Sequence, residues 1–408
     1  MFKGFQLNES IIKSRPTKLN IDSVVETKMD FTLACDIMLD LEGSIRPALY
    51  LAEALVEKGY SVSMISPFIA NSVKEHLNLI GITPRSLGAR LATRNSGSSI
   101  LWFETWAREA FLRLNSRHIV NGSSITVNFS QVISTPSSIW YLQGPPSVAL
   151  KDMKKELSTS FRVAYDVLRP LIEYADGKLV SRMGRTSSHA IANSKFCASM
   201  YSEFGVGVDD VIYPPVDCQT FHPTTSRPSS DYVLTYFGKE TKFSVVKDVA
   251  DMGVRIKAFG SKTKSIPEKL LKHPSVEFLG RVSTNKLVDL YTNALFTLFP
   301  FTHEPFGYIP LESMACGTPV LTYDAQGPGE YVVDDKTGWL VRNDERMVRK
   351  SADLWNNGVD PKTRIDSVKA SSRFDREFYV EKWFECMARW IEGMITERDT
   401  LKLQVASQ

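Results

Sequence analysis

The segment from Phe299 to Asp324, FPFTHEPFGYIPLESMACGTPVLTYD, constrains the fold more than any other part of the chain. The apolar run 294–299 predicts a buried parallel strand. A turn that contains Gly307 follows, then a predicted helix over about 309–316 and a second strand over 318–322. Because helix amides at the positive end of the dipole bind anions, this strand–turn–helix–strand unit predicts an anion site at the edge of a sheet.

Two glutamates lie within this unit. Glu304 is in the turn, and Glu312 follows it on the predicted helix. This spacing places one carboxylate beside the anion site and the second along a wall of the same cleft. A pair of glutamates at this spacing occurs by chance roughly once in a chain of this length. The alternative interpretation is therefore an ordinary turn with two surface glutamates.

The surrounding residues resemble a known family. The pattern E-P-F-G-x-x-x-L-E-x-M-A-x-G-x-P-V is similar to the donor-site signature of the retaining glycosyltransferases of family 4. The resemblance implies an α/β fold of the GT-B type, with two Rossmann-like doubly wound domains that face a deep cleft. It also implies that a C-terminal helix crosses back to the first domain. The backbone of Phe306, Gly307, Tyr308 and Ile309 would then bind the donor.

Composition limits the classes of protein that fit. A chain of 408 residues with 43% apolar and 23% charged residues is a soluble globular protein of about two domains. Its 49 Lys and Arg against 46 Asp and Glu give a net charge of +3, too small to indicate a nucleic acid partner. Five cysteines without a CxxC pair favour a reducing compartment and indicate neither zinc nor disulfides. No apolar run reaches bilayer length and no secretory signal is evident, which predicts a cytoplasmic location.

The domain boundaries follow from the change in pattern along the chain. We expect an N-terminal extension over 1–28, a first Rossmann-like acceptor domain over 29–221 and a linker rich in Pro, Ser and Thr over 222–230. A nucleotide-sugar-binding domain over 231–373 and a crossover helix with its tail over 374–408 complete the chain. Two alternatives stay open: the extension could be a basic arm that touches a membrane, and the last helix could cap the second domain alone.

The first domain opens with a βαβ pattern. A strand over 31–39, a helix over 45–55 and a strand over 61–66 are typical of a doubly wound sheet. The chain has neither a GxGxxG fingerprint nor a Walker P-loop, which argues against a dehydrogenase or an NTPase. In the family that the chain resembles, the first loop faces the donor, so the resemblance makes Gly43 and Ser44 candidate donor-binding residues.

Two segments of the chain depart from the family pattern, one at a single residue and one at a pair of lysines. Gln143 stands where the family has a histidine at the end of a strand, and a glutamine can hydrogen-bond a sugar hydroxyl but cannot share a proton as an imidazole does. Lys239 and Lys242 stand near the place where the family has an arginine and a lysine that bind the diphosphate. Lysine supplies charge without the bidentate fork of arginine. The alternative is that both are surface lysines in a turn.

Further segments resemble the family or have two interpretations. The stretch 276–283 is similar to a loop that meets the nucleobase, which makes Arg281 and Val282 candidates. Residues 189–194 and 211–217 are similar to family strands that end in "NS" and "PPVD". The aromatic residues between 102 and 114 are either core or part of an acceptor site. The lysines at 151, 154 and 155 are either a solvated face or a membrane contact.

These patterns predict a retaining glycosyltransferase that moves a hexose from a nucleotide-diphosphate sugar to a glycan or a lipid-linked saccharide. Glu304, Lys239 and Lys242 are the expected catalytic residues, and Glu312 would bind the ribose hydroxyls. The chain has no Asp-x-Asp motif, so we expect no metal and no cofactor besides the donor substrate. The expected location is cytoplasmic, with peripheral contact at the inner membrane face as an option. The alternatives are an inactive nucleotide-sugar-binding or scaffold protein of the same fold, a sugar-nucleotide epimerase, or a phosphorylase.

Overall fold

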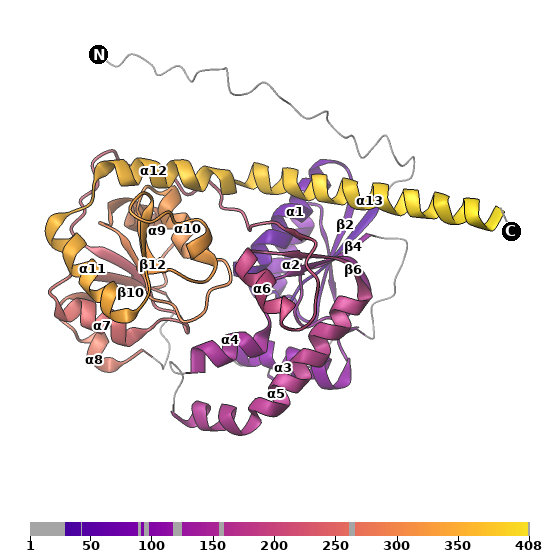
Figure 1. Ribbon diagram of the computed structural model, residues 1–408, viewed down its shortest axis with the longest axis horizontal. Coiled ribbons are helices and arrows are strands. Elements are labelled where there is room, and N and C mark those ends of the chain that lie inside the picture. Colours follow the sequence, from indigo (N-terminus) through magenta and orange to yellow (C-terminus); the bar gives the residue numbers. More distant parts are fainter. Residues whose placement is uncertain are drawn as a thin grey trace, which may run out of the picture. The chain divides into compact units, whose positions relative to one another are not determined.

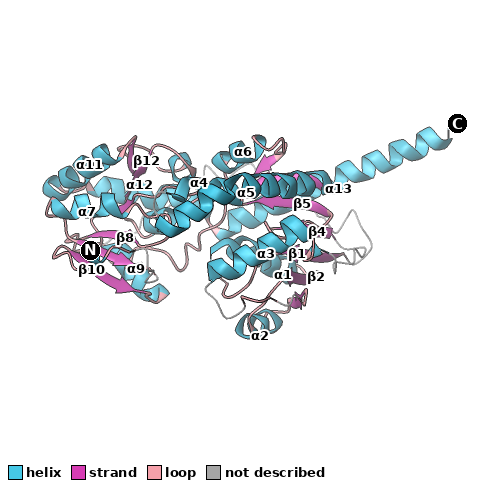
Figure 2. Ribbon diagram, turned by 90° about the horizontal axis from the view of Figure 1, so that it is seen from below, coloured by secondary structure: helices cyan, strands magenta, loops and turns pink. Residues whose placement is uncertain are grey.

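The structure is a computed structural model that describes residues 29–41, 43–88, 91–93, 98–116, 125–154, 159–260 and 266–406. Residues 29–380 form one compact unit that contains two parallel β-sheets, and residues 381–406 belong to a second unit. Helices flank the strands of each sheet (Figures 1 and 2). The two doubly wound sheets expected from the sequence are therefore confirmed.

The first lobe, residues 30–211, contains a parallel sheet with the strand order β3-β2-β1-β4-β5-β6-β7. Its strand order reverses beside β1, which is where doubly wound sheets place their ligands. The strands are β1 Asp30–Ala34, β2 Ser61–Ser66, β3 Thr83–Ser86, β4 Ile125–Asn128, β5 Ser137–Leu142, β6 Ser187–Ala192 and β7 Asp210–Val211. The helices are α1 Arg46–Glu57, α2 Asn71–Leu79, α3 Ser98–Leu112, α4 Pro146–Met153, α5 Thr159–Thr186 and α6 Lys195–Ser202.

The second lobe, residues 233–371, contains a parallel sheet with the order β10-β9-β8-β11-β12-β13. The strands are β8 Val233–Tyr236, β9 Ile256–Phe259, β10 Val276–Gly280, β11 Thr297–Phe299, β12 Val320–Tyr323 and β13 Gly338–Val341. The helices are α7 Phe243–Asp251, α8 Glu268–Leu271, α9 Thr284–Asn293, α10 Tyr308–Ala315, α11 Asp344–Asn357 and α12 Pro361–Ser371. The strand order reverses between β8 and β11, so the segment around Glu304 follows a strand at the reversal point.

Local sequence explains most element boundaries. The strand expected over 61–66 is β2, and Pro47 in the first turn of α1 fits a position where no helical amide bond is needed. The strand expected over 31–39 ends at Ala34 as β1, because the chain turns at Asp36, whose carboxylate accepts hydrogen bonds from Ser130 and Trp102. The polar stretch over 151–171, which contains the lysines at 151, 154 and 155, includes the end of α4 and the first part of α5. The extension over 1–28 and the lysine at 155 lie outside the described residues.

The last helix, α13 Arg376–Ala406, begins against the first lobe. The hydroxyl of Tyr379 donates to the backbone carbonyl of Pro47 at 2.7 Å. Arg376 pairs with Glu53 at 3.0 Å and with Glu57 at 3.4 Å, and both glutamates lie on α1. The chain therefore returns to the first lobe after α12, as the crossover prediction requires. No helix among the described residues has both the length and the apolar composition to cross a bilayer.

The strand β11 is the centre of the second core. Leu298 is completely buried, and β11 pairs with β8 on one side and β12 on the other. We expect Leu298→Ala to lower the free energy of unfolding by about 2–5 kcal/mol, because the substitution leaves a cavity in a packed core. Urea denaturation checks this value. The matched control is Leu79→Ala at a side chain that is 85% exposed, and an equal loss in both variants would contradict the burial of β11.

Candidate functional site

A cleft of about 750 Å³ opens at the carboxyl end of β11, and residues of both lobes line it. It brings together most of the candidate residues, although they are spread over the whole described chain. The candidates that line it are Gly43, Ser44, Gln143, Arg281, Val282, Glu304, Phe306, Gly307, Tyr308, Ile309 and Glu312. The structure therefore brings these candidate residues together in one cavity.

The turn before α10 is held by close backbone packing. Gly307 has a φ of +97°, and a Cβ at this position would lie 2.9 Å from both the Pro328 ring and the Tyr331 hydroxyl. That hydroxyl donates to the carbonyl of Gly307 at 2.6 Å. The amide of Gly327 donates to the carbonyl of Glu304 at 3.0 Å. Since the first amides of a helix have no partner within it, this turn sets donors at the cleft where Tyr308 and Ile309 line it.

Burial raises the pKa of Glu304 to about 8, from a usual value of 4.5. The loss of hydration in the surrounding protein is the main cause, and the negative charge of Glu240 adds to it. The backbone amides of Phe306 and Gly307 act in the opposite direction, and the Phe306 amide lies 3.4 Å from Glu304 Oε1. Near neutral pH the ligand-free protein therefore holds Glu304 mainly as a carboxylic acid, which can donate a hydrogen bond as well as accept one.

Glu312 is paired across the cleft. Its side chain is nearly buried, and its Oε1 accepts a hydrogen bond from Arg46 Nη1 at 2.5 Å. Its Oε2 accepts from the Tyr291 hydroxyl at 3.3 Å. The Arg46 guanidinium also lies over the ring of Tyr308, 5.2 Å from its centre. Arg46 was not among the sequence candidates, although it lies two residues after Ser44, and that proximity was the available signal.

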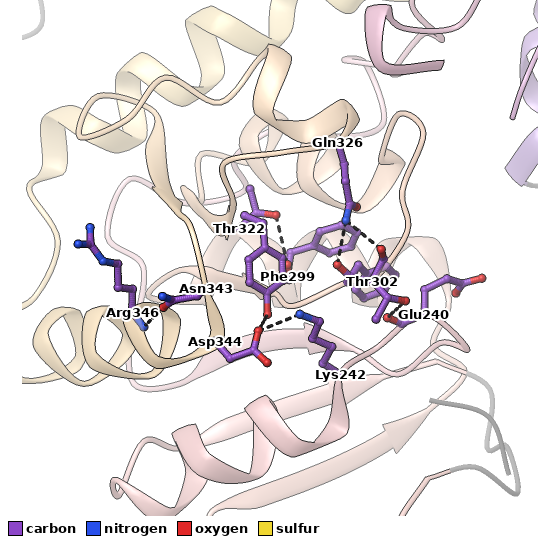
Figure 3. A network of polar contacts seen from close by, with 11 residues as sticks. Glu240, Lys242, Phe299, Thr302, Thr322, Gln326, Asn343, Asp344 and Arg346 are labelled. Atoms are coloured by element: carbon purple, nitrogen blue, oxygen red, sulfur yellow. Dashed lines mark hydrogen bonds and ion pairs between the residues drawn. The ribbon is translucent and has the colours of Figure 1, made fainter. Parts of the chain in front are cut away.

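The two lysines expected at the diphosphate lie apart from this cleft. Lys242 Nζ pairs with Asp344 Oδ1 at 2.8 Å and lies 4.3 Å from the centre of the Tyr323 ring (Figure 3). Lys239 lines a second cavity that adjoins the first, together with His303 and Pro305. Among the residues that line the Glu304 cleft, neither lysine is found. The structure thus brings Lys239 near the site and ties Lys242 to α11.

His303 is a further residue that the sequence did not single out. It is 5% exposed, and its Nδ1 lies 2.9 Å from Oδ2 of Asp152 on α4. It lines both cavities, as does Gln143, whose amide donates to the carbonyl of Phe129 at 2.7 Å. An imidazole oriented by a carboxylate is a common acid–base pair. Its position before Glu304 was visible in the sequence, but its partner on the first lobe was not.

The segments that resembled family strands hold the turn from the other side. The hydroxyl of Ser194 accepts from the Cys197 amide at 2.8 Å, which caps α6, and donates to the carbonyl of Pro305 at 2.6 Å. Glu330 accepts from the amide of Phe196 at 2.7 Å and from the hydroxyl of Tyr213 at 2.8 Å. Both "NS" and "PPVD" segments thus contribute contacts to the Glu304 turn and its neighbour η6 Gly327–Glu330.

Comparison with known proteins identifies the second lobe. Residues 257–371 match the family described as Glycosyl transferases group 1. The chain therefore carries a domain of the group 1 glycosyltransferase superfamily. An uncharacterised glycosyltransferase of Methanocaldococcus jannaschii is 29% identical over 149 residues, which cover 36% of this chain and 41% of the relative. The D-inositol 3-phosphate glycosyltransferase of Acidothermus cellulolyticus is 26% identical over 178 residues, which cover 44% of this chain and 39% of the relative.

These alignments span about two fifths of each relative's length. The fold has a wider match among solved structures. The HepE protein of Anabaena in complex with UDP superimposes with a TM-score of 0.63 at 16% identity, over 88% of this chain and all of that one. The fold of this chain is thus the GT-B fold of glycosyltransferases, as expected. Within the described residues, no group of three or more His, Cys, Asp or Glu side chains is arranged to hold a metal.

The pKa of Glu304 predicts a pH-dependent stability. Between about pH 4.5 and about pH 8 the folded protein keeps a proton that the unfolded chain has lost, so the free energy of unfolding falls as pH rises through this range. We expect Glu304→Gln, which stays neutral, to lose this slope. Melting temperatures of both proteins across the range measure it. The exposed Glu277→Gln is the control, and a parallel pH profile for Glu304→Gln and wild type would show that Glu304 titrates normally.

Proposed function

We propose that the chain is a retaining glycosyltransferase of family 4 that transfers a hexose from a nucleotide-diphosphate sugar to a saccharide or lipid-linked saccharide. One observation carries the proposal. Glu304, the first turn of α10 and Glu312 line a single cleft, and they belong to the segment that matches group 1 glycosyltransferases. The complex of the HepE protein with UDP supports a nucleotide donor in a fold of this kind.

The chemistry requires a site that accepts negative charge. When the bond between the anomeric carbon and the diphosphate breaks, the leaving oxygen gains charge and the sugar ring becomes positive. Amides at the start of α10 stabilise an anion through hydrogen bonds and the helix dipole, and Lys239 adds a cation from the adjoining cavity. Because Lys242 is paired with Asp344, we assign it a supporting role in placing α7 and α11 rather than contact with the diphosphate.

The proposed transfer takes place on one face of the sugar. The acceptor oxygen bonds to the anomeric carbon from the side on which the diphosphate leaves, and the hydroxyl proton passes to the departing phosphate oxygen. The anomeric configuration is then retained, and no metal is required. Glu304, held as a carboxylic acid, would hydrogen-bond the donor sugar and stabilise its position near the first turn of α10.

Glu312 is the proposed anchor of the ribose. Its Oε1 is held by Arg46, so a ribose hydroxyl would bond to Oε2 in place of the Tyr291 hydroxyl, which lies 3.3 Å away. Gly43 and Ser44, which lie just before Ile45 and Arg46, would face the donor from the first lobe. Arg281 and Val282 line the same cleft and would meet the nucleobase. We propose a cytoplasmic location, with peripheral membrane contact where the acceptor is lipid-linked.

An inactive nucleotide-sugar-binding protein of the same fold is the second candidate. The pairing of Lys242 with Asp344 favours it, because a cation expected at the diphosphate is directed elsewhere. The two candidates share the donor site and differ in turnover. Binding of a nucleotide sugar without transfer or hydrolysis would favour the inactive protein.

A nucleotide-sugar panel tests the donor site. We expect one of the UDP-, GDP- or ADP-sugars to raise the free energy of unfolding by roughly 2.7 kcal/mol at about 100 times its dissociation constant. Thermal denaturation with each compound measures the effect. Glu312→Gln should weaken it, because a neutral amide binds ribose hydroxyls less strongly than a carboxylate does. No stabilisation by any compound of the panel would contradict the proposed donor site.

Turnover tests the role of Glu304. We expect Glu304→Gln to lower kcat by about a hundredfold or more, because the amide cannot donate from the position of the acid hydroxyl and a misplaced sugar costs about that factor. Product release from the stabilising nucleotide sugar is measured in the presence of EDTA. Glu277→Gln, at an exposed position on β10, should keep the wild-type rate. A near-normal rate for Glu304→Gln, or turnover only after manganese is added, would contradict the proposed mechanism.

A further inference from the structure

A second cavity of about 890 Å³ adjoins the Glu304 cleft. Most of its lining residues come from the segment after β1 and from the helices α3, α4 and α5. Helix α5 packs against both α3 and α4 (Figures 1 and 2). Four residues line both cavities: Ser44, Gln143, His303 and Pro305. The two cavities therefore meet at the residues on either side of Glu304.

The walls of this cavity are mainly apolar. Helix α3 contributes Ile100, Trp102 and Phe103, and α5 contributes Phe161, Leu168 and Ile172. Phe103, Phe161 and Leu168 are 42%, 54% and 47% exposed, whereas such side chains are usually buried in a soluble protein. Exposed apolar surface that is concentrated in a concave site marks a place where an apolar ligand binds.

Polar groups are placed at particular points of this cavity. His303, which pairs with Asp152, and Gln143 line both the cavity and the Glu304 cleft. Lys239 lines the cavity but not the cleft. Tyr165, on α5, is 3% exposed, and its buried hydroxyl has no hydrogen-bond partner among the described residues. A buried hydroxyl without a partner is costly, so this group points to a polar atom that a ligand supplies.

We propose that this cavity binds the apolar part of an amphiphilic acceptor, a molecule that carries a hydroxyl or a saccharide on a hydrocarbon chain. The proposal rests on the proposed function and names its acceptor class. The apolar part contacts Phe103, Phe161 and Leu168, while the reactive hydroxyl lies at the shared boundary near His303 and faces the donor. The Tyr165 hydroxyl bonds to a polar atom within the ligand. We choose an acceptor as the occupant because the two cavities are continuous, and an acceptor must reach the anomeric carbon of the donor.

Helix α5 offers a matched pair of variants. Leu168 lines the cavity, whereas its neighbour Val167 is 74% exposed and does not line it. Hexyl, octyl and decyl maltosides are titrated below their micelle concentrations by calorimetry, with maltose as the reference. We expect the affinity of the wild type to rise about fourfold for each buried methylene. Leu168→Gln should lower the affinity for decyl maltoside by about tenfold, and Val167→Gln should leave it within about twofold.

The donor site provides the second measurement. The nucleotide sugar that stabilises the wild type should stabilise both variants equally, which shows that they fold and keep the Glu304 cleft. Two results would overturn the inference and leave the proposed function intact. The first is a maltoside affinity that does not depend on chain length. The second is an equal loss of affinity in both variants, as expected for a membrane-facing surface. Failure of every nucleotide sugar to bind would overturn the proposed function, and with it the acceptor role of the cavity.

Discussion

The site depends on a backbone turn whose carbonyl groups are all held by hydrogen bonds from other segments. Glu304 to Gly307 must leave β11 and enter α10 within a few residues, and the carbonyl groups of this turn receive donors from Gly327, Tyr331 and Ser194. Gly327 is packed so tightly that a Cβ there would lie 2.2 Å from the Pro305 carbonyl. Because these contacts fix the backbone, the Glu304 carboxyl stays in a poorly hydrated place where its proton is retained.

Local sequence could predict the parts of the site that a single supersecondary unit supplies. The turn with Glu304 and the helix α10 with Glu312 lie within one short stretch, so the spacing in the sequence limits how far apart the two carboxyl groups can be. The parallel strands were visible as apolar runs, because strands buried on both faces lack polar alternation. The resemblance added the first-lobe loop with Gly43 and Ser44, which local spacing alone could not have joined to the same cleft.

Contacts between residues far apart in the chain could not be predicted. Arg46 and Glu312 are 266 positions apart, and neither position alone indicates the other. The same holds for Asp152 and His303, which come from different lobes. The pairing of Lys242 with Asp344, at the start of α11, is a further contact that the sequence did not indicate, and the phosphate role of this lysine stays a prediction. The aromatic residues of α3 differ in their surroundings. Trp106 lies in the core, whereas Phe103 is partly exposed and lines the second cavity.

Ser194 joins the two lobes through one oxygen atom. The atom receives the amide that begins α6 and gives its proton to the carbonyl before Phe306. An alanine at this position loses both bonds together. The removal of this single hydroxyl would therefore disturb the start of a first-lobe helix and the loop of the second lobe at the same time.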